Sequence, residues 1–123
     1  LASGLLSGKL NGESKFAKND HRNYNRDGQE FNVGETFSGL PFEKGLDLVK
    51  EIKKITQDNL SQFALRWILD FEAVTVVIPG SKSPQQVADN CAASALPPLT
   101  EETHKALSEF YLNDVSPHIR GKY

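Results

Sequence analysis

Apolar side chains recur at helical spacing in two stretches of the chain. The first stretch, residues 41–55, opens with a proline, and its apolar stripe consists of Leu46, Val49, Ile52 and Ile55. The second stretch lies near residues 62–72, and its stripe consists of Ala64, Leu65, Ile68 and Leu69. Ser61 precedes it in the position of an N-cap. The pattern therefore predicts two amphipathic helices, each with one apolar face.

The polarity pattern changes to that of a strand at residues 74–78. This short run is rich in β-branched side chains, as buried strands are: Val74, Val76, Val77 and Ile78. Pro79 and Gly80 end it. Ser83 then caps a third helix near residues 84–95, and Pro84 suits its first position, where the missing N–H costs nothing.

A fourth helix is predicted after Thr100, which serves as its cap. Glu101 and Glu102 follow in the first turn, where negative charge favours the helix dipole. This explains the acidic pair without a catalytic role. The helix is expected to end near residues 112–113, and residues 116–123 are expected to form a loop.

Residues 11–39 are polar, and their apolar positions follow neither the helical nor the strand period. They are predicted to form a long loop, and loops of this length are either disordered or functional. Widely spaced aromatic side chains occur in it: Phe16, Tyr24, Phe31 and Phe37. For the chain alone we favour an unstructured insertion. The alternative is a flap whose aromatic side chains pack over a ligand.

The order of elements points to parallel α/β architecture: a strand end at Leu1–Leu6, the loop, two helices, a strand and two helices. A lone complete strand cannot form a sheet, because its backbone groups need partners. The chain also contains no methionine, even at position 1. We therefore expect a piece of a longer protein, or a chain that pairs with another copy of itself.

Composition limits which binding partners and which cellular compartment are expected. With a net charge of −2, bulk attraction to nucleic acid or to an anionic membrane is not expected. No apolar run approaches membrane-spanning length, and no signal peptide is recognisable. Cys91 is the sole cysteine, which excludes an intrachain disulfide and indicates a reducing compartment. We expect a cytoplasmic protein that binds neither nucleic acid nor membrane.

Self-contained reaction centres are not evident. His21, His104 and His118 have no neighbouring Ser or Cys suggesting a triad, and none has metal-ligand spacing with another His or Cys. We therefore assign no catalytic residue and no metal ligand.

The junction between the strand at 74–78 and the following helix is the strongest chemical candidate. A helix N-terminus presents unpaired backbone N–H groups and the positive end of a dipole, which together favour an anion. Ser81 adds a hydroxyl and Lys82 a full positive charge. These residues are consistent with a phosphate site and equally with an ordinary turn that carries a solvated lysine.

Four segments, in order, resemble the C-terminal part of the aldo-keto reductases. Leu1–Lys9 is similar to the end of the family's seventh barrel strand, and Ser61–Leu69 to the helix before strand eight. Val77–Asn90 resembles the family's cofactor signature, and Gly121–Tyr123 the Gly-x-Arg-Tyr ending of many bacterial members. The resemblance implies that residues 1–123 form the C-terminal portion of a (β/α)8 TIM barrel, with helices, the last strand and the cofactor-binding turn in 41–123.

The resemblance further implies a reductase that uses NADPH, or less often NADH, to convert aldehydes and ketones to alcohols. By position, the pyrophosphate side would be lined by Leu1, Ser3, Gly4, Leu5 and Ser7. The adenosine phosphate would lie at Gly80, Ser81 and Lys82, with Gln86 and Asn90 near the adenine and ribose. Many members carry Arg where this chain has Gln86, so a preference for NADPH would rest mainly on Lys82.

The family's catalytic Asp, Tyr, Lys and His lie in the first half of the barrel, and Tyr24, Tyr111 and Tyr123 do not match the catalytic tyrosine. The chain alone is therefore expected to be inactive and, with its apolar faces uncovered, to self-associate. The parent enzyme would act on a small-molecule carbonyl. Two alternatives are a non-catalytic relative that binds NADP and regulates a channel, and a free-standing interaction module.

Overall fold

The computed structural model describes residues 1–56 and 59–121, and within them all regular structure is helical. The longer α-helices are α2 (Phe42–Thr56), α3 (Leu60–Leu69), α4 (Pro84–Ala92) and α5 (Glu101–Phe110), and α1 (His21–Tyr24) is a single turn. Short 3-10 helices are η1 (Ala2–Ser7), η2 (Thr36–Gly39), η3 (Ala93–Ala95) and η5 (Ser116–His118). A π-helix, η4 (Tyr111–Val115), continues α5.

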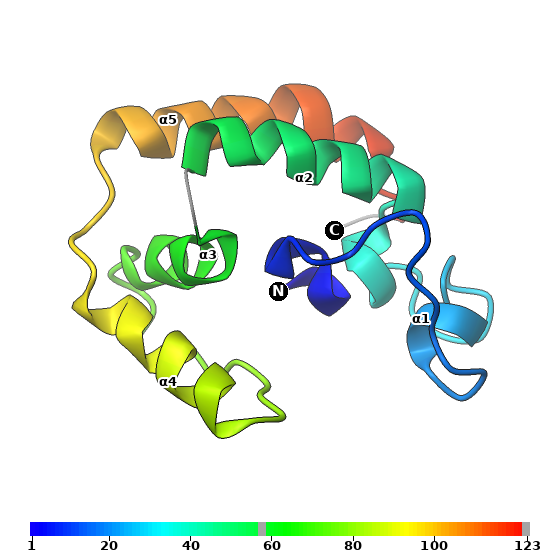
Figure 1. The fold of residues 1–123 in the computed structure, drawn as a ribbon. Coiled ribbons are helices and arrows are strands. Elements are labelled where there is room, and N and C mark those ends of the chain that lie inside the picture. The colour runs from blue at the N-terminus through cyan, green and yellow to red at the C-terminus, as the bar shows by residue number, and fades with distance from the viewer. Residues whose placement is uncertain (57–58, 122–123) are drawn as a thin grey trace.

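The helices are arranged around α3 and the N-terminal turn. Figure 1 shows α2 and α5 running next to each other, with α3 and η1 beneath them and α4 on the far side of α3. Helix α3 contacts both η1 and α4, and α2 contacts η1, α3 and α5. Helix α3 therefore supports both segments to which the resemblance assigns cofactor contacts, Leu1–Lys9 and Val77–Asn90.

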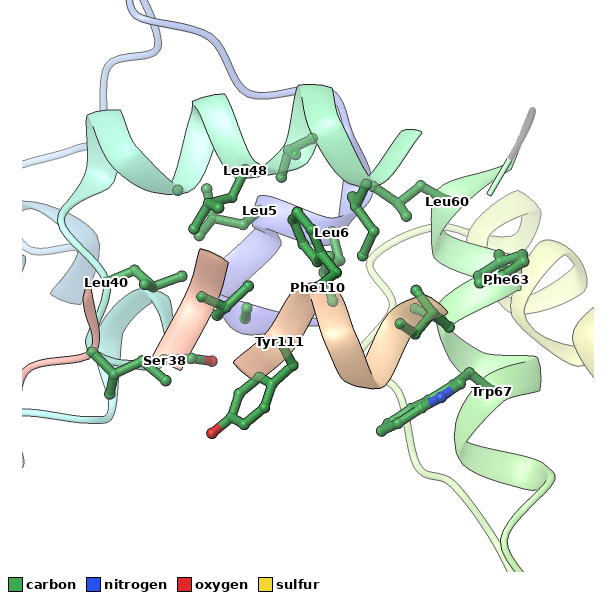
Figure 2. A pocket seen from close by; sticks show the side chains of 18 residues that line it. Leu5, Leu6, Ser38, Leu40, Leu48, Leu60, Phe63, Trp67, Phe110 and Tyr111 are labelled. Carbon is green, nitrogen blue, oxygen red and sulfur yellow. The ribbon is translucent and has the colours of Figure 1, made fainter. Parts of the chain in front are cut away.

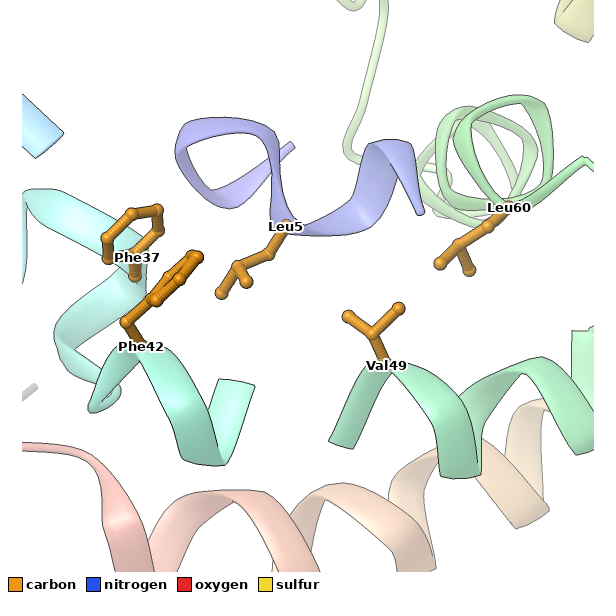
Figure 3. Packing of buried hydrophobic residues seen from close by; sticks show 5 residues of the cluster. All are labelled: Leu5, Phe37, Phe42, Val49 and Leu60. Atoms are coloured by element: carbon orange, nitrogen blue, oxygen red, sulfur yellow. The ribbon is translucent and has the colours of Figure 1, made fainter. Parts of the chain in front are cut away.

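The buried core lies where η1, η2, α2 and α3 meet (Figure 3). It consists of Leu5, Phe37, Phe42, Val49 and Leu60. The rings of Phe37 and Phe42 lie 4.9 Å apart, and the Phe16 ring stands edge-on to Phe42 at 5.9 Å. Such tilted and edge-on pairs are favourable beyond the area they bury. The core therefore joins the N-terminal turn to the first long helix.

The two amphipathic helices are confirmed, with shifted details. In α2 the buried positions include Phe42, Leu48 and Val49, while Leu46 and Ile52 pack at the edge of the core. Helix α3 begins at Leu60, and its cap is Asn59, whose side chain accepts a hydrogen bond from the Gln62 N–H. The prediction of Ser61 as the cap was wrong, because the carboxamide of Asn59, two residues earlier, accepts from the free Gln62 N–H.

The predicted caps of the third and fourth helices are confirmed. The Ser83 hydroxyl accepts from the Gln86 N–H at 3.3 Å, and the Thr100 hydroxyl accepts from the Thr103 N–H at 3.2 Å. The tail departs from the expected loop, because η5 forms at Ser116–His118. Lys122 and Tyr123, part of the tail motif, lie outside the described residues.

The strand predicted at 74–78 is absent, and no strand occurs elsewhere in residues 1–56 and 59–121. Val76 is 67% exposed and Ile78 90% exposed. Likewise, Leu1–Leu6 is not a strand end but largely forms η1. The described residues therefore lack the strands of the predicted α/β architecture. β-Branched residues favour a strand only where a neighbouring strand completes the hydrogen bonds.

The segment 11–39 is not an unstructured insertion. It contains α1 and η2, and the fully buried Asn25 ties it together. The Asn25 carboxamide oxygen accepts from the N–H groups of Glu30 and Phe31, and its nitrogen donates to the Phe31 carbonyl at 2.8 Å. Phe37 is completely buried in the core. The aromatic residues at 16 and 37 therefore stabilise the fold, whereas Tyr24 and Phe31 are exposed.

We expect the isolated 123-residue chain to form dimers or larger species at micromolar concentration. The exposed segment 74–78 presents apolar side chains and backbone groups that belong to no sheet in the described residues, and such segments pair with other chains. Val76→Lys together with Ile78→Lys should shift the chain toward monomer, whereas Leu112→Lys, at another exposed apolar site, should not. Sedimentation velocity measures this, and a monomeric wild type would contradict it.

No helix in the described part of the chain is both long enough and apolar enough to cross a bilayer.

Candidate functional site

The N-terminal turn, residues 1–7, has an unusual backbone. Ala2, Ser3 and Gly4 have φ angles of 49°, 53° and 100°, which lie in the left-handed region. The Gly4 N–H donates to the Leu1 carbonyl, and the Ser7 hydroxyl donates to the Gly4 carbonyl at 2.6 Å. The Leu5 side chain enters the core and is only 3% exposed. The turn is therefore anchored on one side by Leu5.

Side chains from distant parts of the chain hold this turn in place. The Ser3 hydroxyl accepts a hydrogen bond from the Phe37 N–H at 3.3 Å, and the Arg22 guanidinium donates to the Ser3 carbonyl at 3.5 Å. The Lys53 ammonium donates to the Gly8 carbonyl at 3.1 Å. Two cations thus lie beside η1. Neither contact has a local signal in the sequence, because 19 and 45 residues separate the partners.

Arg22 is itself fixed by a carboxylate and a ring. Its guanidinium lies 2.6 Å from the Asp20 carboxylate and 4.5 Å from the centre of the Phe16 ring. The hydrogen bond from Arg22 outweighs the effect of burial and lowers the pKa of Asp20 to about 2. Asp20 therefore stays ionised at neutral pH and keeps Arg22 oriented toward the N-terminal turn.

The second group of predicted site residues meets at the start of α4. The Asn90 carboxamide nitrogen donates to the Ser81 hydroxyl at 2.9 Å, and the Lys82 N–H donates to the Gln86 carboxamide oxygen at 2.7 Å. With Ser83 as the cap, these bonds fix the residues that enter the helix. The Lys82 side chain is exposed and has no polar partner among the described residues. Its ammonium is free to meet an anion.

Gly80 stands in open space. A side chain added there would meet no atom within 4 Å. Of the ten predicted cofactor residues, Ser81, Lys82, Gln86 and Asn90 are thus joined by hydrogen bonds, and Gly80 adjoins them in sequence.

The two groups are joined through the first turn of α3. The Ser61 hydroxyl donates to the Leu6 carbonyl at 3.2 Å, and the Gln62 carboxamide donates to the Asp89 carbonyl at 2.7 Å. Within the described residues, no hydrogen bond or ion pair runs directly from residues 1–7 to residues 80–90. The relative position of these two groups is therefore set by Ser61 and Gln62, which are adjacent residues of α3.

An apolar cavity of about 400 Å³ opens between η1, α2, α3 and α5 (Figure 2). Among the side chains that line it are Leu5, Leu48, Phe63, Trp67 and Phe110. Trp67 is 36% exposed at this cavity and packs edge-on against Phe71. The lining offers almost no polar group, so the cavity does not suit the charged parts of a dinucleotide.

A buried ion-pair cluster links α3 to α5. The Asp70 carboxylate accepts from Arg66 at 2.8 Å, from His104 at 3.0 Å and from the Leu99 N–H at 2.9 Å. Burial favours a raised pKa for Asp70, but the hydrogen bonds from Leu99, His104 and Arg66 outweigh it and hold the pKa below its ordinary value. Sequence inspection missed this cluster because Asp70 and His104 are 34 residues apart.

Neither this cluster nor the remaining histidines forms a recognisable reaction centre. His21 hydrogen-bonds the Thr36 hydroxyl, and His118 is exposed. In the part of the chain that the structure describes, no group of His, Cys, Asp or Glu side chains could hold a metal ion.

Comparison with known proteins points to one family. Residues 1–112 match the Aldo/keto reductase family. The aldo-keto reductase str7 from Strobilurus tenacellus is 33% identical over 105 residues, which cover 83% of this chain and 28% of that protein. The glycerol dehydrogenase AKR11B4 from Gluconobacter oxydans has a similar structure, with a TM-score of 0.71 and 28% identity, over 98% of this chain and 34% of that one. The chain thus spans no more than 34% of the length of either relative.

Proposed function

The chain belongs to the aldo/keto reductase family, and on that basis we propose that it forms the C-terminal, cofactor-binding part of an NAD(P)H-dependent, cytoplasmic reductase of the bacterial type. The parent barrel enzyme would reduce the carbonyl group of an aldehyde or ketone to an alcohol. Similarity to a protein described as a glycerol dehydrogenase agrees with an alcohol–carbonyl reaction. The observation that carries the proposal is the hydrogen-bonded entry to α4, where the family match coincides with the exposed ammonium group of Lys82.

The entry to α4 has the chemistry that the adenosine phosphate requires. The helix is nine residues long, so its N-terminal N–H groups and dipole favour a negative charge. Lys82 supplies a full positive charge and Ser81 a hydroxyl at the same place. The nicotinamide ring of the bound cofactor supplies the hydride. In this proposal these residues hold the phosphate end and do not touch the reacting carbon.

Gln86 acts on Lys82 rather than on the phosphate charge. Its carboxamide oxygen accepts from the Lys82 N–H, which fixes the backbone from which the lysine side chain extends. A carboxamide carries no charge, so only Lys82 in this turn can distinguish a 2′-phosphate from a 2′-hydroxyl electrostatically. We propose that NADPH is the preferred cofactor, with NADH accepted more weakly.

The N-terminal turn would receive the pyrophosphate. Ser3, Gly4 and Ser7 offer small side chains and backbone groups, and Arg22 and Lys53 add positive charge close by. We assign no catalytic role to any residue of this chain and expect it to be inactive by itself. Cys91 is a free thiol on α4, in keeping with a reducing compartment.

Lys82→Ala in the full-length protein should weaken NADPH binding by about 1–3 kcal/mol, the range for hydrogen bonds to charged groups. NADH binding should change little, because NADH lacks the 2′-phosphate. Titration of each cofactor, followed by fluorescence or calorimetry, measures both affinities. Lys50→Ala is the matched control, because Lys50 belongs to α2 and pairs with Asp47 on the surface. Figure 1 shows that α2 lies away from α4.

Two results would contradict the assignment. Equal losses for NADPH and NADH would mean that Lys82 does not recognise the 2′-phosphate. Failure of the wild-type protein to bind either cofactor would contradict the proposed function itself.

A further inference from the structure

The C-terminal segment is in close contact with the end of η2. The Arg120 N–H donates to the Gly39 carbonyl at 2.8 Å. A Cβ atom on Gly39 would lie 2.8 Å from the Arg120 carbonyl oxygen, a distance that real side chains do not adopt. Gly39 also has a φ angle of 73°, in the region that favours glycine. Residue 39 is therefore a glycine for two reasons, and the two backbones meet directly.

The Arg120 guanidinium binds both ends of the segment that contains η2: residues 26 and 27 before it and residue 40 after it. One nitrogen lies 2.6 Å from the Asp27 carboxylate. Another donates to the carbonyls of Arg26 and Leu40, at 3.2 and 3.4 Å. A planar guanidinium can serve several acceptors in a fixed geometry, which an ammonium cannot. Arg120 thus closes a loop of which residues 26 and 40 are the ends.

The middle of that loop is conformationally strained. Phe37 and Ser38 have φ angles of 53° and 56°, which non-glycine residues rarely adopt. Such conformations persist only where the surroundings hold them. Phe37 is held by its burial in the core, and the residues directly after Ser38 are held by Arg120.

The strained segment hydrogen-bonds the N-terminal turn. The Phe37 N–H donates to the Ser3 hydroxyl at 3.3 Å, across 34 residues of sequence. Ser3 lies in the left-handed turn that we assign to the cofactor pyrophosphate. The contacts therefore run without a break from Arg120 through η2 to Ser3.

We propose that Arg120 is a positioning residue for the cofactor: it holds η2 in the conformation in which the Phe37 N–H fixes Ser3. This proposal rests on the proposed function of the N-terminal turn. Arg120 itself touches no cofactor. Because the pyrophosphate is common to NADPH and NADH, Arg120 affects both cofactors alike, in contrast to Lys82.

The test uses the full-length protein with the substitutions Arg120→Gln and Arg120→Lys. We expect Arg120→Gln to raise the Kd of both NADPH and NADH about tenfold, as the loss of a charge-assisted hydrogen bond would. Arg120→Lys keeps the charge opposite Asp27 but not the paired donors, so an intermediate rise is expected. His118→Ala, an exposed change in the same segment, is the control and should leave both Kd values unchanged.

A double-mutant cycle separates positioning from general destabilisation. If Arg120 acts through Ser3, then Ser3→Ala should weaken binding in the wild type but add little in Arg120→Gln. Hydrogen exchange provides a readout without cofactor: amides of residues 2–7 should exchange faster in Arg120→Gln than in the His118→Ala control.

The outcomes are distinct. If the wild type binds cofactor, any one of three results would overturn the role of Arg120 without affecting the proposed function. These are additive losses in the cycle, unchanged exchange at residues 2–7, and unchanged Kd values in Arg120→Gln. A wild type that binds neither cofactor would overturn the proposed function, and the assignment of Arg120 with it.

Discussion

Phe37→Ala is expected to lower the free energy of unfolding by about 3–5 kcal/mol, the usual range for deleting a fully buried phenylalanine ring. Phe37 has no exposed surface, and its ring packs against Phe42 at 4.9 Å and Phe16 at 6.1 Å. Truncation removes those contacts and leaves a cavity at the junction of η1, η2 and α2. Denaturant titration of the full-length protein measures the change.

A loss of this size is a large part of the stability of an ordinary domain, so Phe37→Leu is included as a milder variant. It should cost less than the alanine change. Phe31→Ala is the matched control, because the Phe31 side chain is 40% exposed and its ring pairs with the exposed ring of Tyr24. It should lower stability by less than about 1.5 kcal/mol. Equal losses of stability at positions 31 and 37 would show that the cluster of the Phe16, Phe37 and Phe42 rings is not part of the core.

Asp70→Ala should destabilise the protein by about 3 kcal/mol, because it leaves a largely buried cation without its partner. The side chains of Asp70 and Arg66 are 6% and 13% exposed, so water replaces the lost carboxylate poorly. His104 and the Leu99 N–H lose their acceptor at the same time. The expected result is a lower melting temperature and loosened docking of α5 on α3. Asp114→Ala, an exposed change, should have little effect.

Acid titration gives an independent measure of the same cluster. The pKa of Asp70 is held below its ordinary value of 3.8 in the folded protein. A depressed carboxyl pKa stabilises the fold at pH values above 3.8, and that stabilisation is lost as the pH falls through the lower folded value. In Asp70→Asn this part of the acid dependence should disappear. A wild type and an Asp70→Asn variant that lose stability in parallel below pH 3.8 would contradict the role of the cluster.

Local signals allowed the helices to be predicted. A cap is a hydrogen bond between residues three apart, so Ser83 and Thr100 can be recognised without knowledge of the rest of the chain. The apolar stripe of α2 is equally local. The error at Ser61 has the same origin, because Asn59 is also a good cap residue and lies only two residues earlier.

The strand could not be predicted reliably from its own residues. Valine and isoleucine at 74–78 satisfy the composition of a strand, but a strand exists only when a second segment supplies the ladder. No residue in the described part of the chain does so. Helices, in contrast, satisfy their backbone groups internally, which is why the helical predictions are confirmed where the strand is not.

The candidate site was only half predictable for a related reason. Ser81, Lys82, Gln86 and Asn90 lie at the entry to one helix or on it, and their hydrogen bonds join residues only four and nine positions apart. The supports of the N-terminal turn come from far away in sequence. Asp27 and Arg120, for example, are 93 residues apart, and neither belongs to a motif. Only the folded structure shows that they meet.

The placement of Ser61 and Gln62 has a consequence for how the chain tolerates length changes. Successive residues of a helix are turned by about 100° around its axis, so inserting one residue after Asn59 would turn both side chains away from their acceptors together. The carbonyls of Leu6 and Asp89 would be released at the same moment. In the proposed function a dinucleotide would span from one of these regions to the other, and the distance between them would then be set by a single helical turn. Natural length variation should therefore be selected against at the start of α3.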